Sequence, residues 1–415
     1  MKLVAAFWLC LAAWFTPWSG AGAADPVRIA FIGGLSGPFA LQGEETLRNF
    51  EVAVDLLNRR GGALGGRKFE IVPFDNKGNP QETLVVLRQA IDQGLRHVIS
   101  GVSPIALAIS DAVAKHNARD PDRSVLFLDY GALDPSLTES KCSFWHFRFE
   151  AHATTQTDVL TDFMAKQSSL RKVYLVNQDY SFGQSVSRMA RERLGAKRPD
   201  VRIVGDDLVP LGKVKDFAPY FAKIRAAEAD AVLTSNWGND LALLIKAGHD
   251  AGTRATFYTL LASFYGTAGA MGAGGGDRVR SLAAWHINAA DPARQKSLLE
   301  YKGKMAAVSN LAYLPVFRVI DMLGAAFDQA GTTDPARVAY ALEGAHYAGP
   351  SGDSWMRAED HQMIAPVYLM SFAKAGRPGV EVEEEKSGFG WKTEALVAAR
   401  DAVPPLKCQM ERPPR

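Results

Sequence analysis

The sequence lacks the short motifs that mark the common nucleotide and hydrolase chemistries. It contains neither G-x-G-x-x-G nor G-x-x-x-x-G-K-[ST], so neither a dinucleotide-binding turn nor a phosphate-binding loop is expected. Neither G-x-S-x-G nor H-E-x-x-H occurs, which removes the usual signatures of a serine hydrolase and of a zinc metalloprotease. We therefore expect no enzymatic activity, and the rival interpretation as an exported hydrolase is disfavoured.

Excess charge of one sign is also missing. The 415 residues hold 47 Lys and Arg against 45 Asp and Glu, a formal net charge of +2, with no basic cluster interleaved with aromatics. A nucleic-acid surface is therefore not expected. The closest histidine pair, His146 and His152, has no cysteine pair nearby and makes a weak metal site. We expect no metal and no cofactor.

Long apolar segments are absent after the first residues. Lys2 precedes the apolar run Leu3–Phe15, which is short for a bilayer span, and the small residues Ala21–Ala23 follow. This pattern predicts a secretory signal peptide within residues 1–24, cleaved after Ala23 or, alternatively, after Ala24, and a soluble protein exported to the periplasm.

Cysteine is scarce. Cys10 lies inside the apolar run, so the mature chain would keep only Cys142 and Cys408. In an oxidising compartment an even number of cysteines suggests a disulfide, which would tie the C-terminal end to the middle of the chain. Two separate buried thiols are the alternative.

The stretch from Arg28 to Asn58 organises the N-terminal part of the chain. Arg28–Ile32 is an apolar run suited to a buried strand; glycines and Ser36-Gly37-Pro38 follow, and then a helix with regularly spaced apolar residues. In an α/β sheet, small ligands bind outside the carboxyl ends of the strands. The groups of Ser36, Gly37 and Phe39 are placed to face such a crevice, although a plain strand-to-helix turn is the alternative.

Strands and helices then alternate twice. The first series continues through strands at 68–75, 97–100 and 124–130, and an aromatic-rich strand is expected at Cys142–Glu150. The second series has strands at 172–178, 201–209, 231–236, 256–261 and 280–287. This alternation predicts the fold class α/β, with two Rossmann-like, doubly wound lobes. Because helical patterns return after the second series, the chain is expected to cross between the lobes more than once and to form a hinge.

The last third of the chain carries weaker signals. We expect a glycine-rich loop at Gly266–Gly276, a last strand at Ile364–Phe372, and a polar tail from Ala375 onward. The charge run Glu381–Lys386 is expected to be a solvated surface turn. The predicted organisation is a first lobe of 25–148 plus 287–363, a second lobe of 149–286 plus 364–405, and a C-terminal tail of 406–415.

The order of the motifs resembles one known family. FIGGLSGPFALQG, LLNRRGGALGGRKFEIV, SGVSPIALAISDAV, VYLVNQDYSFGQS and ADAVLTSNWGNDLALLIKAGHDAG occur in sequence. Together they resemble the type I periplasmic solute-binding proteins of branched-chain amino acid ABC transporters, over nearly the whole mature chain. The resemblance implies two lobes joined by three crossovers, a monomer that closes on a small-molecule ligand, and an ABC permease at the membrane surface as partner.

The resemblance also implies which residues contact the ligand. The serine that takes the ligand carboxylate matches Ser103, and a following backbone position matches Gly131, whereas a family threonine falls on Leu133. A family tyrosine falls on Phe182 by register or on Tyr180 by chemistry, and another falls on Trp237. The expected ligand-binding set is Ser36, Phe39, Gln42, Ser103, Gly131, Leu133, Tyr180, Phe182, Trp237 and Leu261.

Leu261 decides the expected ligand. The family acid that pairs with the ligand α-ammonium falls at or near this leucine, and no Asp or Glu lies between Asp250 and Asp277. An ammonium taken out of water without a carboxylate is costly. We therefore expect a small organic carboxylate, first of all an aromatic one, because the pocket candidates include aromatic residues: Phe39, Trp145, Tyr180, Phe182, Trp237, Phe264 and Tyr265. A branched-chain amino acid, or a sensor role on the same fold, remains the alternative.

Overall fold

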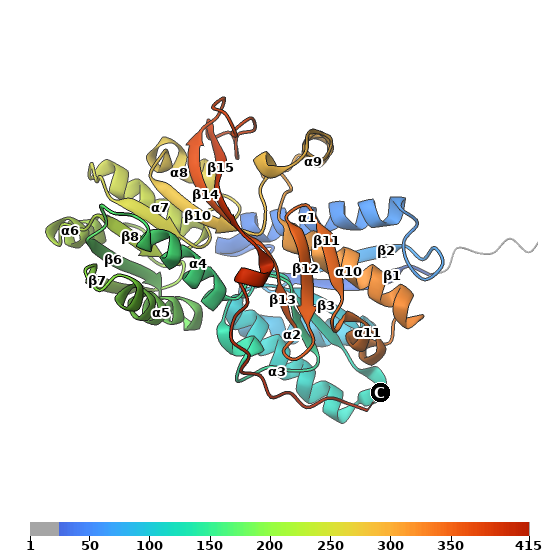
Figure 1. Cartoon of the computed structure of the whole chain (residues 1–415). Helices are drawn as coiled ribbons and strands as arrows, with labels where there is room; N and C mark the ends of the chain where they lie inside the picture. Colours follow the sequence, from blue (N-terminus) through green and yellow to red (C-terminus); the bar gives the residue numbers. More distant parts are fainter. Residues whose placement is uncertain (1–24, 415) are drawn as a thin grey trace, which may run out of the picture.

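The computed structural model describes residues 25–414 (Figure 1). The predicted signal peptide and Cys10 lie outside the described residues. Within residues 25–414, no helix combines the length and apolar character needed to cross a membrane. The described chain forms two α/β lobes, each built on one sheet, as predicted.

The first lobe contains an eight-stranded sheet in the order β11-β12-β13-β5-β4-β3-β1-β2. Strands β1 to β5 are parallel, and Ile29 of β1 lies opposite Ile71 of β2. The strands are β1 (Val27–Gly33), β2 (Phe69–Asp75), β3 (His97–Ser100), β4 (Leu126–Asp129), β5 (His146–Arg148), β11 (His346–Gly349), β12 (Gly352–Arg357) and β13 (Gln362–Ile364). The helices are α1 (Ala40–Arg59), α2 (Pro80–Asp92), α3 (Ser103–Arg119), α9 (Pro292–Lys304), α10 (Leu314–Ala330) and α11 (Pro335–Leu342).

The second lobe repeats this plan in a seven-stranded sheet, ordered β15-β14-β10-β9-β8-β6-β7. Strands β6 to β10 are parallel, and β14 and β15 add to the edge in antiparallel orientation. The strands are β6 (Lys172–Gln178), β7 (Arg202–Val209), β8 (Ala231–Thr234), β9 (Thr256–Thr259), β10 (Val279–Ala283), β14 (Val367–Lys374) and β15 (Phe389–Val397). The helices are α4 (Ala153–Ala165), α5 (Ser181–Lys197), α6 (Ala218–Ala226), α7 (Gly238–Asp250) and α8 (Thr267–Gly275).

Both sheets reverse their strand order at the same point, although the strands there are parallel. In each, the first strand of the lobe lies between the second and the third, so the chain leaves to one side and then to the other. A crevice forms outside the carboxyl ends of the strands at such a point, and ligands bind there. The two crevices lie at β1/β3 in the first lobe and at β6/β8 in the second.

An aromatic cluster packs beneath the loops of the first crevice, between β1, α1 and the end of β4. The rings of Phe31 on β1, Phe50 on α1 and Tyr130 after β4 lie with centroids 5.4–6.2 Å apart. All three side chains are buried. Close packing of this kind fixes the ends of β1 and β4 relative to α1.

Three connections join the lobes, between β5 and α4, between β10 and α9, and between β13 and β14. Arg148, at the end of β5, is wholly buried and ties the first connection to the third. Its Nε donates to Oε1 of Gln362 at 2.8 Å, and its Nη1 donates to the carbonyl oxygen of Asp134 at 2.7 Å. The predicted three-crossover hinge is therefore present, and Arg148 is one of its structural anchors.

The C-terminal segment makes a further link, which we call the strap (residues 402–413). The carbonyl of Ala402 still accepts from Thr155 in the second lobe, at 3.1 Å, whereas the carbonyl of Pro404 accepts from Arg357 in the first, at 2.8 Å. Further along, the sulfur of Cys408 is bonded to that of Cys142. The dark red segment in Figure 1 follows this path to the C mark.

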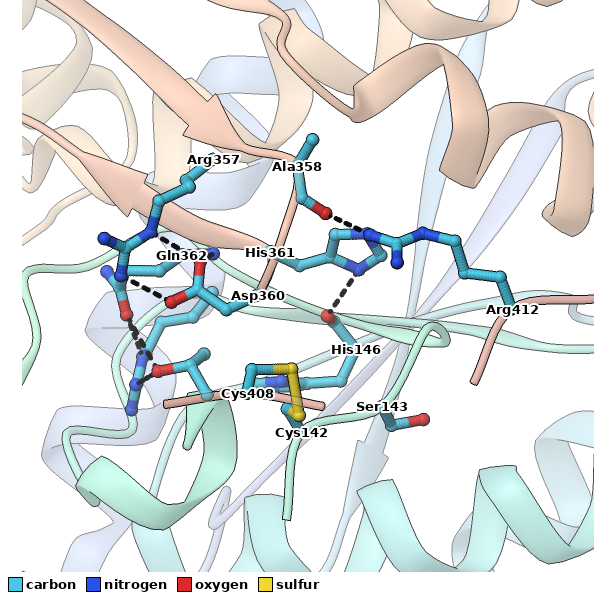
Figure 2. Close-up of a disulfide and its surroundings, with 12 residues drawn as sticks. Cys142, Ser143, His146, Arg357, Ala358, Asp360, His361, Gln362, Cys408 and Arg412 are labelled. Carbon is cyan, nitrogen blue, oxygen red and sulfur yellow. Dashed lines mark hydrogen bonds and ion pairs between the residues drawn. A yellow bond between two sulfur atoms is a disulfide. The ribbon is translucent and has the colours of Figure 1, made fainter. Parts of the chain in front are cut away.

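Figure 2 shows how the end of the strap is held beside this disulfide. Arg412 donates to the carbonyl oxygen of Ala358 at 2.6 Å and to Oε1 of Glu343 at 3.0 Å. The same Glu343 carboxylate contacts His361 at 2.9 Å. The strap is thus fastened to the first lobe by a covalent bond, by the partly buried contact of Pro404 and by the exposed contacts of Arg412.

Four expectations from the sequence are wrong. Thr267–Gly275 forms helix α8 rather than a loop, because Glu385 accepts from the amides of Gly266 and Gly269 and so satisfies its first turn. The aromatic strand is only three residues long, and β11 and β12 add an unforeseen hairpin. Ile364–Phe372 is not the last strand, since β15 follows it and pairs with β14. The Glu381–Lys386 run is not simply a solvated turn, since Glu385 packs against α8.

Candidate functional site

The loops at the carboxyl ends of both sheets face one another across a cleft. The first lobe contributes the segments after β1, β3 and β4, and the second contributes those after β6, β8 and β9. Two adjoining cavities lie between them, with volumes of about 40 and about 140 Å³. Their shared lining is Val102, Tyr130, Trp237 and Phe264. We call the pair the aromatic cleft.

Phe39 and Trp237 close the aromatic cleft from opposite lobes. Their rings stack with centroids 5.1 Å apart, and Trp237 is only 6% exposed. Gln42, also from the first lobe, donates through Nε2 to the carbonyl oxygen of Tyr265 at 3.2 Å. These contacts hold the lobes together in a closed arrangement.

Ser103 supplies a hydroxyl donor at the polar end of the cleft. It opens helix α3, whose N-terminus carries no side-chain cap. The Ser103 hydroxyl oxygen accepts from the amides of Leu133 and Asp134, both at 3.2 Å. Since both lone pairs are used, the hydroxyl proton is the group left to donate. A helix N-terminus also favours negative charge.

Tyr180 supplies a second donor in the same way. Its phenolic oxygen accepts from Nε1 of Trp237 at 3.0 Å, which leaves the phenolic proton to be donated. Burial raises the pKa of Tyr180 well above its usual value, so the hydroxyl keeps its proton at any physiological pH. One donor thus comes from each lobe.

The remaining walls are apolar. Leu133, Phe182 and Leu261 line the smaller cavity, and Phe182 is 1% exposed. Among the described residues, none of those lining either cavity is an aspartate or a glutamate. Leu261 therefore lines the smaller cavity, where no aspartate or glutamate is among the lining residues.

Two predicted contacts are arranged differently from expectation. Ser36 is exposed, donates its hydroxyl proton to Asp75 at 2.6 Å, and is not among the residues that line the cavities. Gly131 does line the smaller cavity, but its amide donates to Oδ1 of Asp129 at 3.0 Å. That amide is therefore engaged within the protein.

Trp145 does not belong to the cleft. It packs edge-on against Phe144, with centroids 5.1 Å apart, and lines a surface groove beside Met410 of the strap. The expectation that it is a pocket residue is wrong, because Trp145 comes just before β5 and so lies at the amino end of that strand, whereas the cleft lies at the carboxyl ends of the strands.

Sequence reasoning missed Tyr130 and Tyr313, which both line the smaller cavity. Tyr130 follows β4 directly, so its position at a strand end was a usable signal. Tyr313 precedes α10 and packs edge-on against Phe264 and Tyr265, with both centroid distances 5.9 Å. Nothing near it in sequence marks it as a cleft residue.

The histidine pair has structural partners. Nε2 of His146 lies 3.2 Å from Oδ2 of Asp129, and Nδ1 of His152 accepts from the amide of Thr154 at 3.0 Å. In residues 25–414 no group of three or more His, Cys, Asp or Glu is arranged to hold a metal ion.

Two similar lobes with a closable cleft between their facing strand ends define the class of bilobal solute-binding proteins. The family described as "Periplasmic binding protein" matches residues 26–377. The chain belongs to this family, as the resemblance in the sequence predicted.

Curated relatives and solved structures agree with this assignment. The chain is 30% identical over 398 residues to "Leu/Ile/Val-binding protein homolog 4" of Brucella melitensis, covering 94% of each. A "Leucine-, isoleucine-, valine-, threonine-, and alanine-binding protein" from Brucella ovis, in a closed conformation, is 30% identical with TM-score 0.82, over 94% of this chain and 100% of that one.

A solute-binding protein from Rhodopseudomonas palustris in complex with 3,4-dihydroxy benzoic acid shares the fold. Its TM-score is 0.77 at 17% identity, over 90% of this chain and 98% of that one. A second, from R. palustris in complex with benzoate, has TM-score 0.76 at 19% identity, over 92% and 99%.

Proposed function

We propose that this chain is the extracytoplasmic substrate-binding component of an ABC importer, and that its ligand is a small carboxylate with an apolar, first of all aromatic, body. One observation carries the proposal. Two hydroxyl oxygens of the aromatic cleft, on Ser103 and Tyr180, already act as acceptors, so both of these hydroxyls are left to donate. Paired donors in an apolar setting suit a carboxylate, which only accepts.

The rest of the cleft supports an apolar body. Rings from both lobes, including Phe39 and Trp237, surround the cavities, and flat aromatic ligands pack well against such rings. The absence of an acidic residue from the lining disfavours an α-ammonium group. The complexes of two R. palustris neighbours with benzoic acids are consistent with this ligand class.

The mechanism is binding without chemical conversion. The first lobe holds the carboxylate at Ser103, and the second lobe then brings Trp237 and Tyr180 over the body of the ligand. Ligand that contacts both lobes stabilises the closed state and shifts the population toward it. A permease at the membrane surface would recognise this closed form. We propose that the protein acts as a monomer in the periplasm.

The names of the curated relatives favour a second candidate, a branched-chain amino acid. A thermal-shift panel separates the two. The purified protein is heated with benzoate, 4-hydroxybenzoate, aliphatic acids, amides, leucine, isoleucine and valine. A native-state ligand raises the midpoint with the logarithm of its saturation. We expect shifts with aromatic acids and none with leucine; a shift with leucine alone would establish the amino-acid alternative.

A further inference from the structure

A second cavity, which we call the hinge pocket, lies where the connections between the lobes pass one another. Its volume is about 50 Å³. The first connection and the start of α4 contribute Glu150 and Gln156, the second connection contributes Trp285 and His286, and the β14–β15 segment contributes Glu384. Leu261, Phe264 and Tyr313 line both the hinge pocket and the aromatic cleft. The hinge pocket is therefore next to the cleft, and these three residues form the wall between them.

Four buried polar atoms of the hinge pocket have no hydrogen-bond partner within the described chain. They are Oη of Tyr265, Nε1 of Trp285, Nδ1 of His286 and Oε1 of Gln156. Each of these residues is 5% exposed or less. Buried polar groups are nearly always satisfied, so orphaned atoms gathered around one cavity indicate a place for a polar group.

Carboxyl groups, including those of Glu150 and Glu384, line the hinge pocket. Burial and the neighbouring Glu385 carboxylate raise the pKa of Glu384 to about 8, although Lys302 opposes the shift. Burial also raises the pKa of Glu150, against the opposing effect of Arg318. Nζ of Lys302 donates to Oδ1 of Asn310 at 2.7 Å, and Nη2 of Arg318 donates to Oγ of Ser351 at 3.3 Å. Burial therefore favours the neutral form of both carboxyl groups, and a cation with several N–H donors placed beside them would stabilise their ionised form.

We propose that the hinge pocket receives a protonated amino group, carried by the ligand at the end remote from its carboxylate. This inference rests on the proposed function, because the carboxylate is placed at Ser103. In an α-amino acid the ammonium is adjacent to the carboxylate, so it stays near Ser103 when the carboxylate is bound there. A ligand with an apolar spacer between the two groups places the ammonium beside Glu384 and Glu150, where Gln156 offers another acceptor.

Calorimetric titration with a matched series tests this inference. The series is 4-methylbenzoate, 4-(hydroxymethyl)benzoate and 4-(aminomethyl)benzoate, with benzylamine as an amine that lacks the carboxylate. We expect the aminomethyl compound to bind at least about tenfold more tightly than the methyl compound. Glu384→Gln removes this preference, and the control Glu359→Gln, at an exposed position, keeps it. Glu150→Gln, checked for folding by circular dichroism, should weaken it as well.

The pH dependence gives a second test on the unaltered protein. An ammonium is bound best when Glu384 is ionised, so affinity for the aminomethyl compound should rise as pH increases from about 6 toward 8, whereas affinity for the methyl compound should not. Equal affinities for methyl and aminomethyl compounds would overturn the inference while leaving carboxylate binding intact. Binding of benzylamine that is lost in Glu384→Gln would support the hinge pocket even if every plain carboxylate fails. Absence of binding by either amine would overturn it.

Discussion

Phe39 and Trp237 stack across the cleft with their ring planes 29° apart, although one follows the first strand of the first lobe and the other follows β8 of the second. The contact joins the two lobes directly. It is therefore a wall of the aromatic cleft, and we propose that it couples ligand binding to closure of the lobes.

Replacement of Trp237 tests this wall. Trp237→Ala removes the stacked ring and the partner of Tyr180, and we expect binding of an aromatic carboxylate to weaken by about 2–4 kcal/mol. Trp237→Phe keeps a ring over the ligand, so its affinity for the aromatic carboxylate should fall less. Isothermal titration measures both. Equal affinities for wild type and Trp237→Ala would place the ligand elsewhere.

Position 261 should determine whether amino acids bind. Leu261→Glu places a carboxylate on the wall of the smaller cavity, and we expect it to create measurable binding of leucine, because the ammonium gains a partner. Leu261→Gln is the matched variant without charge and should not. Thermal-shift titration with leucine compares them, and a response of the glutamine variant equal to that of the glutamate variant would contradict the electrostatic explanation.

The disulfide of the strap should contribute to stability. The Cys142–Cys408 bond closes a loop with a sequence separation of 266 residues. Loss of a native disulfide typically lowers the free energy of unfolding by about 2–4 kcal/mol. We expect Cys408→Ser and Cys142→Ser to lower it equally, and the double variant to lower it no further. Denaturant titration measures this; additive losses would mean that the two thiols act separately.

Acid should destabilise the protein through its buried histidines. Burial lowers the pKa of His97 to about 3 and that of His286 to about 4, below the ordinary value of 6.5. A group that is neutral when folded and protonated when unfolded stabilises the fold above pH 6.5, and this contribution is lost as pH falls toward the folded pKa. The melting temperature should therefore fall between about pH 6.5 and 3. His97→Phe should reduce that slope, and His249→Gln, at an exposed position, should not.

The alternation of strands and helices could be predicted because each parallel strand is a short apolar run between turn residues. Helix α8 and strand β15, at the edge of the second lobe's sheet, could not be predicted in this way. Thr267–Gly275 is rich in glycine, which disfavours helix locally, and it becomes helical because Glu385, distant in sequence, binds its first amides. β15 is mostly exposed, so its apolar and polar residues do not alternate as they would in a half-buried strand.

In the site, too, residues placed by the local strand pattern could be predicted, whereas residues placed by contacts distant in sequence could not. Ser103 and Trp237 follow predicted strands directly, so the topology brings them to the cleft. Tyr313 is placed there by the packing of α10, and the hinge pocket gathers Glu150 and Trp285 from two connections between the lobes and Glu384 from the β14–β15 segment. Long-range packing of that kind leaves no periodic signal in a single sequence.

Isothermal titration of the purified protein with benzoate and, separately, with leucine is the direct test that the ligand is an aromatic carboxylate. We predict saturable heat with benzoate, weakened in Ser103→Ala because the hydroxyl donor is gone, and no heat with leucine. Saturable binding of leucine without any binding of benzoate would contradict an aromatic carboxylate ligand and favour an amino acid instead.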